Sequence, residues 1–213
     1  MTRVILIRHG FSQANAENRF AGHSNVPLSD IGQEQARRAA AWLSEHEKID
    51  KLYTSDLLRA YDTARPIAEA FGLEITPEPR MRELFAGEWE GKVFADILVE
   101  YAEDFAVWKN DFSNARCTGG ESVAELYHRA TEAVLSLAEK NDGKTIAITS
   151  HATPLRAIKC FSAGDGADKM HKHPFPTNAS IQIYLYEDGK LIPERLNITD
   201  HLEGLMTDLP KGV

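Results

Sequence analysis

Short, uninterrupted apolar runs constrain the fold of this chain more than any other feature. Residues 4–7 form a continuously apolar run, and two further short segments with apolar centres, residues 51–54 and 144–149, are also expected to be strands. Such runs are typical of strands that are covered on both faces, as in parallel sheets with helices on either side. The chain therefore predicts an α/β fold.

Amphipathic segments separate the apolar runs. Ser29 or Asp30 is expected to cap a helix that extends to about residue 46, and residues 121–140 give the clearest amphipathic pattern. Pro154 favours the first turn of a further helix. Four residues are expected near one face of the first helix: Ile31, Ala36, Ala39 and Leu43.

A second helix is expected to open at Ser55 or Asp56 and to end near Gly72. Pro66 lies inside it and is predicted to kink or split it. Residues 92–112 are helical in pattern and rich in aromatic and acidic side chains.

The remaining segments complete a sheet. Residues 73–76 are expected to form a third strand, and residues 181–186 and 191–198 flank Asp188-Gly189, a strong hairpin signal. Because strands alternate with helices, we expect a three-layer sandwich with a mostly parallel central sheet flanked by helices and a helical lid insertion. With no linker or repeat, residues 1–213 are assigned to one domain.

Composition narrows the possible partners. The formal net charge is −8, which argues against nucleic acid, since phosphate backbones need clustered Lys and Arg. No segment is long enough for a signal peptide core or a membrane span. Cys117 and Cys160 are expected to be reduced thiols of a cytoplasmic protein, with a disulfide as the alternative.

Two histidines and two arginines follow the predicted strands. The first strand ends in Arg8-His9, the second is followed by Arg59 one helical turn on, and the late strand ends at His151. Because functional sites form beyond the carboxyl ends of parallel strands, these side chains are expected to meet at one edge of the sheet.

That set of side chains suits phosphate chemistry. Arg offers a planar fork for phosphate oxygens, as expected here of Arg8 and Arg59. Neutral imidazole is a competent nucleophile near neutral pH, so His9 is a candidate for attack on phosphorus, and His151 for stabilising the transferred group. A lone histidine is more often an ordinary core residue, so the prediction depends on their convergence.

Longer motifs carry a family resemblance. The run at residues 6–15, LIRHGFSQAN, resembles the signature of the histidine phosphatase superfamily, in its phosphoglycerate mutase-like branch. Further matching stretches occur in the family's order at residues 19–22, 27–32, 54–60, 82–84, 87–91, 119–122 and 150–151.

The resemblance implies roles for particular residues. His9 would be the phosphorylated nucleophile, Arg8, Arg59 and His151 would complete the phosphate pocket, and Glu83 would give a proton to the leaving oxygen and later activate water. No metal or cofactor is implied, and the partners would be a small phosphorylated substrate and inorganic phosphate. Four other residues are expected to contact substrate or shape the pocket: Asn15, Ala21, Gly22 and the backbone of Ala152.

Departures from the family pattern favour hydrolysis over a mutase reaction. Phe11 stands where the mutases carry Glu. The resemblance implies a lid over about residues 92–120, and this segment offers only Lys109 and a separate Arg116 in place of the paired arginines of the mutases. The expected activity is therefore that of a metal-independent phosphomonoesterase. Six aromatic residues suggest apolar pocket walls: Phe11, Phe85, Trp89, Phe105, Trp108 and Phe112.

Other functions stay open at this stage. Phosphoglycerate mutase-type transfer and a non-catalytic module that binds a phosphorylated ligand are the main alternatives. A metallohydrolase would use His171 and His173 with His128 or Asp165, although no third ligand follows at a recognised interval. A serine hydrolase based on Ser150 lacks a nucleophile-elbow pattern. A homodimer is the base-rate expectation for assembly.

Overall fold

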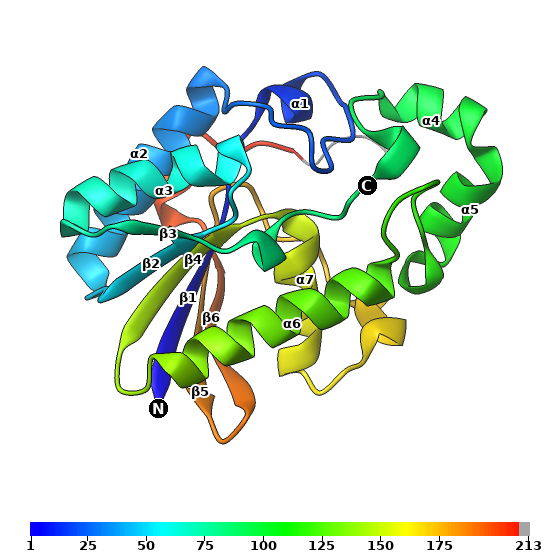
Figure 1. The fold of residues 1–213 in the computed structure, drawn as a ribbon. Helices are drawn as coiled ribbons and strands as arrows, with labels where there is room; N and C mark the ends of the chain where they lie inside the picture. Colours follow the sequence, from blue (N-terminus) through cyan, green and yellow to red (C-terminus); the bar gives the residue numbers. More distant parts are fainter. Residues whose placement is uncertain (209–213) are drawn as a thin grey trace.

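A sheet of six strands organises the computed structural model, which describes residues 1–208 (Figure 1). Its order is β3-β2-β4-β1-β5-β6. Strands β3, β2, β4 and β1 are parallel, β5 runs antiparallel to β1, and β6 pairs antiparallel with β5. The strands are β1 (Thr2–Arg8), β2 (Lys51–Thr54), β3 (Ile75–Pro77), β4 (Thr145–Ser150), β5 (Ile181–Glu187) and β6 (Lys190–Ile198).

Helices cover both faces of this sheet, which confirms the three-layer α/β fold. Because strand side chains alternate, Val4 and Leu6 of β1 pack on one face, and Ile5 and Ile7 on the other. Helices α6 (Val123–Lys140) and α7 (Ala152–Ser162) cover the first face, and α2 (Asp30–His46) and α3 (Leu58–Phe71) cover the second. The central strands are thus buried on both sides.

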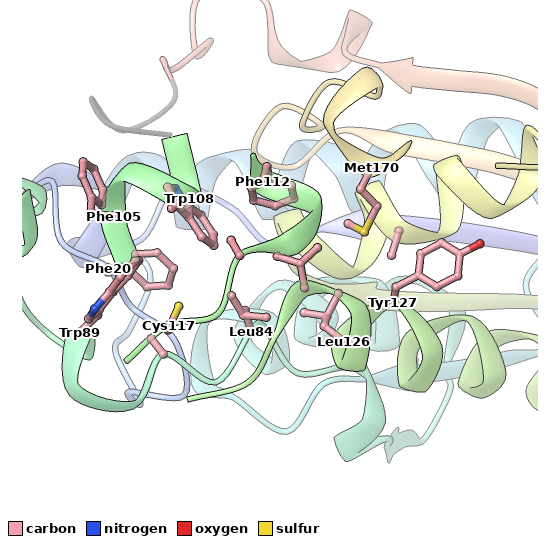
Figure 2. Packing of buried hydrophobic residues seen from close by; sticks show 14 of the residues in the cluster. Phe20, Leu84, Trp89, Phe105, Trp108, Phe112, Cys117, Leu126, Tyr127 and Met170 are labelled. Atoms are coloured by element: carbon pink, nitrogen blue, oxygen red, sulfur yellow. The ribbon is translucent and has the colours of Figure 1, made fainter. Parts of the chain in front are cut away.

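The cap segment, residues 92–120, lies beyond the sheet as a helical excursion (Figure 1). It contains α4 (Phe94–Glu100) and α5 (Ala102–Asn110), and a short helix α1 (Gln13–Ala16) lies after β1. Trp89, which is fully buried, packs against Phe20, Phe105 and Trp108 in an aromatic core of the cap segment (Figure 2). Single 3-10 turns occur at Pro79–Met81, Gly87–Trp89, Phe112–Asn114, Ala167–Lys172 and Asp200–Leu202.

Several expectations about local structure are confirmed. Ser29 caps α2, and Gly72 ends α3 in the left-handed conformation. The helix expected from residue 121 begins at Val123, where Ser122 caps it through a capping box with Glu125 that the sequence analysis did not anticipate. The hairpin forms around Asp188 and Gly189. The third strand falls two residues later than predicted, at Ile75–Pro77, because the chain pairs with β2 only from Ile75.

The structure corrects three details. Pro66 lies inside α3 without splitting it, since the helix keeps its assignment from Leu58 to Phe71. That helix begins at Leu58 with Leu57 at the N-cap, so neither Ser55 nor Asp56 caps it. The Ser55 hydroxyl accepts from Leu57 N at 3.3 Å, before the helix, and lies 2.7 Å from His151 Nε2. Ile31 is 45% exposed and lies off the buried face of α2.

Two further findings concern the chain as a whole. Cys117 and Cys160 are buried free thiols, as expected, and form no disulfide. Within residues 1–208, no helix is both long enough and apolar enough to cross a membrane.

Candidate active site

One pocket lies at the carboxyl ends of the central strands. Arg8 at the end of β1 pairs in register with Ser150 at the end of β4, so the residues that follow both strands meet at one edge. The cavity has about 560 Å³ of empty space, its open mouth included. It is lined by Arg8, His9, Ser12, Asn15, Arg19, Phe20, Ala21, Gly22, Arg59, Glu83, Phe94, Trp108, Ala152, Thr153 and Phe175.

His9 is buried and held in one orientation. Its Nδ1 lies 2.7 Å from the carbonyl oxygen of Gly10. Since a carbonyl only accepts, Nδ1 carries the proton, and Nε2 is left with a free lone pair. Burial, together with the nearby Arg59 and Arg8 charges, holds the pKa of His9 well below 6.5. The ring is therefore neutral at pH 7 and has the form that a nucleophile needs.

His151 faces His9 from the end of β4, with the two ring centroids 5.1 Å apart. Its Nε2 lies 2.7 Å from the hydroxyl of Ser55. Its Nδ1 is buried and has no hydrogen-bond partner among residues 1–208. When the Ser55 hydroxyl donates to Nε2, the proton of the neutral ring sits on Nδ1, which becomes a donor for an incoming oxygen.

Arg8 and Arg59 are buried without carboxylate partners at hydrogen-bond distance in the described part of the chain. Carbonyl oxygens position them: Arg8 Nη1 donates to Pro176 at 2.6 Å, and Arg59 Nη2 donates to Gly22 at 2.8 Å. The Nε of each has no partner within residues 1–208. Burial lowers the pKa of both to about 10, so both stay cationic at pH 7. Two charges with free donors form an anion site.

Glu83 also lines this pocket, where backbone groups hold its carboxylate. Its Oε1 accepts from Leu84 N at 2.9 Å, and both carboxylate oxygens lie near Thr153 N, at 3.3 and 3.4 Å. Thr153 is in the first turn of α7, whose N-terminus therefore faces the pocket. Glu83 is the acidic residue that lines the pocket, within residues 1–208.

The remaining predicted residues, Asn15, Ala21, Gly22 and Ala152, all line the pocket. Asn15 also closes a capping box, in which its Oδ1 accepts from the backbone N of Ser12 at 3.0 Å. Gly22 has φ +49°, and a Cβ there would lie 2.7 Å from Glu90 Oε1. Its backbone turn is what presents the carbonyl that holds Arg59.

Comparison with known proteins decides the family. The sequence pattern of the Histidine phosphatase superfamily (branch 1) matches residues 4–199. This chain belongs to that superfamily. Phosphoserine phosphatase 1 of Hydrogenobacter thermophilus is 33% identical over 213 residues and covers 100% of both chains. The adenosylcobalamin/alpha-ribazole phosphatase of Escherichia coli is 32% identical over 79% of this chain and 82% of its own length.

Solved structures agree with this assignment. The structure of Bacillus stearothermophilus YhfR has a TM-score of 0.88 and 27% identity, and covers 95% of this histidine phosphatase and 100% of its own chain. A phosphoserine phosphatase from Entamoeba histolytica, solved with phosphoserine, gives a TM-score of 0.83 and 26% identity over 95% of this chain and 100% of its own. The protein is accordingly a phosphatase of this family.

Some pocket residues of this histidine phosphatase escaped the sequence reasoning, and some predicted ones lie elsewhere. His9, Arg8 and His151 were predicted from their positions at the ends of strands. Glu83 was predicted only from the family motif, because nothing in its local sequence pointed to the pocket. Of the six aromatic residues expected in the walls, only Trp108 lines the pocket, because most of the others fill the aromatic core or lie on the surface. Four aromatic residues form the actual wall: Phe20, Phe94, Trp108 and Phe175.

Residues proposed for other chemistries do not assemble. His173 pairs with Asp165 at 3.0 Å, whereas His171 contacts Ser113 at 3.1 Å. No three His, Cys, Asp or Glu side chains in residues 1–208 are grouped as a metal site would require. The Ser150 hydroxyl is buried and donates to Met81 O at 2.7 Å, so it faces no catalytic base.

Proposed function

We propose that this histidine phosphatase hydrolyses small phosphate monoesters through a phosphohistidine formed on His9. One observation carries the proposal. Arg8 and Arg59, whose Nε atoms lack partners within residues 1–208, line the same pocket as the neutral His9. His151, whose buried Nδ1 also lacks a partner there, is not itself a lining residue, but its ring centroid lies 5.1 Å from that of His9. Unpaired buried donors cost free energy in the empty site and gain partners when a phosphoryl group binds.

In the first step, His9 Nε2 attacks phosphorus, and the bond between phosphorus and the ester oxygen breaks. Glu83, in its protonated form, donates its proton to the departing oxygen, which leaves as an alcohol. The arginines and His151 Nδ1 hold the equatorial oxygens, where charge must be stabilised during transfer.

In the second step, water attacks the phosphohistidine. The Glu83 carboxylate accepts a proton from this water, the bond between phosphorus and Nε2 breaks, and inorganic phosphate forms. Glu83 is thereby protonated again, and His9 returns to its neutral state with Nδ1 still bonded to Gly10. The positive charge of the site comes from the protein, so the route uses no metal.

The relatives support the kind of substrate. Two of the curated relatives are named as phosphatases of phosphoserine or alpha-ribazole phosphate compounds. The Entamoeba histolytica enzyme has been solved with phosphoserine and with 3-phosphoglyceric acid. A mycobacterial glucosyl-3-phosphoglycerate phosphatase has been solved with VO3. We therefore propose a small phosphorylated metabolite as substrate and inorganic phosphate as product.

The test is release of inorganic phosphate from an aryl phosphate. We expect wild type and His128→Ala, a variant of an exposed histidine that does not line the pocket, to turn over at equal rates. The rate of His9→Ala should fall by at least about a thousandfold. Rapid quenching with labelled substrate should trap an acid-labile phosphoenzyme in wild type only. A chelator should leave the rate unchanged.

Three results would contradict the proposal. Equal rates for wild type and His9→Ala would point to a module that only binds the ligand. Conversion of 3-phosphoglycerate to 2-phosphoglycerate far faster than phosphate release would make the protein a mutase. Loss of activity on chelation would require a metal.

A further inference from the structure

Four aromatic rings stand above the phosphate-binding floor of the pocket. Phe20 precedes the turn at Gly22, Phe94 begins α4, Trp108 lies in α5, and Phe175 comes from the segment before β5. Phe20, Phe94 and Trp108 are 4–7% exposed, and Phe175 is half-buried. The space that a leaving group would occupy is therefore bounded by ring surfaces.

These rings are fixed by their neighbours. Phe20 lies 5.2 Å from Trp108 and 5.5 Å from Phe94, centroid to centroid, and its other contacts reach the aromatic core shown in Figure 2. The guanidinium of Arg156 lies 4.2 Å from the ring centre of Phe175. A wall built from packed rings is preformed and does not have to be ordered when a ligand binds.

The charges of the pocket are already assigned. Three arginines line it, and two of them, Arg8 and Arg59, face the phosphoryl position. The third, Arg19, donates to the Glu17 carboxylate at 2.7 Å and to Gly91 O at 2.7 Å, so its charge already has a carboxylate partner. Among residues 1–208, the pocket lining contains no further Lys or Arg that a substrate carboxylate could use.

An ammonium group on the leaving group would also lack a partner. Glu83 is the acidic lining residue in the described part of the chain, and the proposed reaction uses it for proton transfer to the ester oxygen. A leaving group that carried both a carboxylate and an ammonium would lose its hydration without regaining charge partners. Flat apolar groups lose nothing of this kind and bury area on the rings.

We propose that the pocket selects phosphate monoesters whose leaving group is aromatic or otherwise apolar, over esters with a charged leaving group such as phosphoserine. This selectivity rests on the proposed hydrolysis at the same site. The proposed preference differs from the substrate that the names of the phosphoserine-phosphatase relatives give for those proteins.

Matched esters test the selectivity without differences in chemical reactivity between aryl and alkyl groups. The set is 2-phenylethyl phosphate, ethyl phosphate and O-phosphoserine, all esters of primary alcohols. We expect kcat/KM for 2-phenylethyl phosphate to exceed that for each of the others by roughly tenfold or more, the effect of burying one phenyl group.

Variants locate the effect in the wall. Phe175→Ala, at a half-buried position, should reduce the preference for the phenyl ester over ethyl phosphate severalfold or more. Phe71→Ala removes an equally half-buried ring at the end of α3, far from the pocket, and should leave the preference unchanged. An unchanged preference in Phe175→Ala, or an equal loss in Phe71→Ala, would overturn the assignment.

Binding of inert analogues keeps the two proposals apart. Calorimetry with 3-phenylpropylphosphonate and with 2-amino-4-phosphonobutyrate, the phosphonate analogue of phosphoserine, measures selectivity without any turnover. Tighter binding of the phenyl compound supports the proposal even if His9 chemistry fails. Equal binding of both analogues, or turnover of phosphoserine as fast as that of the phenyl ester, would refute it while leaving hydrolysis intact.

Discussion

The buried histidines show how single neighbours decide chemical role. His9 and His151 have the same side chain and nearly the same burial. Gly10 O accepts a hydrogen bond from Nδ1 of His9, whereas the Ser55 hydroxyl contacts Nε2 of His151. The first ring therefore presents a lone pair, and the second presents a donor. A nucleophile and an oxygen-binding group arise from one residue type.

Ser55 is expected to act as a positioning residue for His151. Removing its hydroxyl in Ser55→Ala frees the ring to adopt the other tautomer, so we expect kcat/KM for an aryl phosphate and the affinity for vanadate to fall together by about tenfold. Ser55→Cys keeps a weaker donor, so its kcat/KM and its affinity for vanadate should lie between those of wild type and those of Ser55→Ala. A loss of thermal stability with unchanged vanadate affinity would show that Ser55 has only a structural role.

Glu83 is expected to matter in proportion to the basicity of the leaving group. In Glu83→Gln the departing alkoxide of an alkyl phosphate receives no proton, so its kcat/KM should fall by about a hundredfold or more. The rate at which Glu83→Gln is phosphorylated by an aryl phosphate should fall much less, because an acidic phenol leaves without needing a proton. Quenched-flow measurement of the phosphoenzyme with both esters tests this, and equal losses would exclude a general-acid role.

Helix starts illustrate what local sequence decides at the scale of elements. Ser29 caps α2 as predicted, and Ser122 caps α6 in the same way, because a cap depends on residues within one turn. Ser55 was expected to cap α3 in the same way, but it does not. Its hydroxyl lies 2.7 Å from Nε2 of His151, which follows the neighbouring strand β4. Pro66 leaves α3 whole, because tertiary packing of its buried face outweighs one missing hydrogen bond.

The cap of α6 should therefore contribute measurably to stability. Ser122→Ala removes the side-chain acceptor for Glu125 N, and we expect the free energy of unfolding to fall by about 1 kcal/mol. Ser44→Ala, at an exposed position inside α2, provides the matched control and should change it by a few tenths at most. Urea unfolding measures both, and equal effects would exclude a capping contribution.

At the scale of the whole molecule, three histidines couple stability to pH: His9 and His151 are buried, and His201 is partly buried. Burial lowers the pKa of His9, His151 and His201 below 6.5. Below pH 6.5 the unfolded chain therefore binds more protons than the folded one, and the free energy of unfolding should fall as pH drops. Lowered carboxyl pKa values, such as that of Glu34 from 4.5, act only at lower pH.

Thermal unfolding between about pH 7.5 and about pH 5 checks this expectation. The melting temperature of the wild type should decrease as the pH is lowered over this range. The melting temperature of His9→Asn should decrease less, because one titrating group has been removed. A melting temperature that is constant over the range, or an unchanged slope in the variant, would contradict the assigned protonation states.

The sequence by itself determined the layers, the strand ends and the family. Apolar runs, caps and turn residues act through neighbours within a few positions, so they could be interpreted without coordinates, and they brought Arg8, His9, Arg59 and His151 to one edge. Only the tertiary structure decided which aromatic rings face the substrate and which donors are unpaired. Phe175 lies far along the chain from Phe20, and burial and hydrogen bonding depend on contacts between distant segments, which no local pattern encodes.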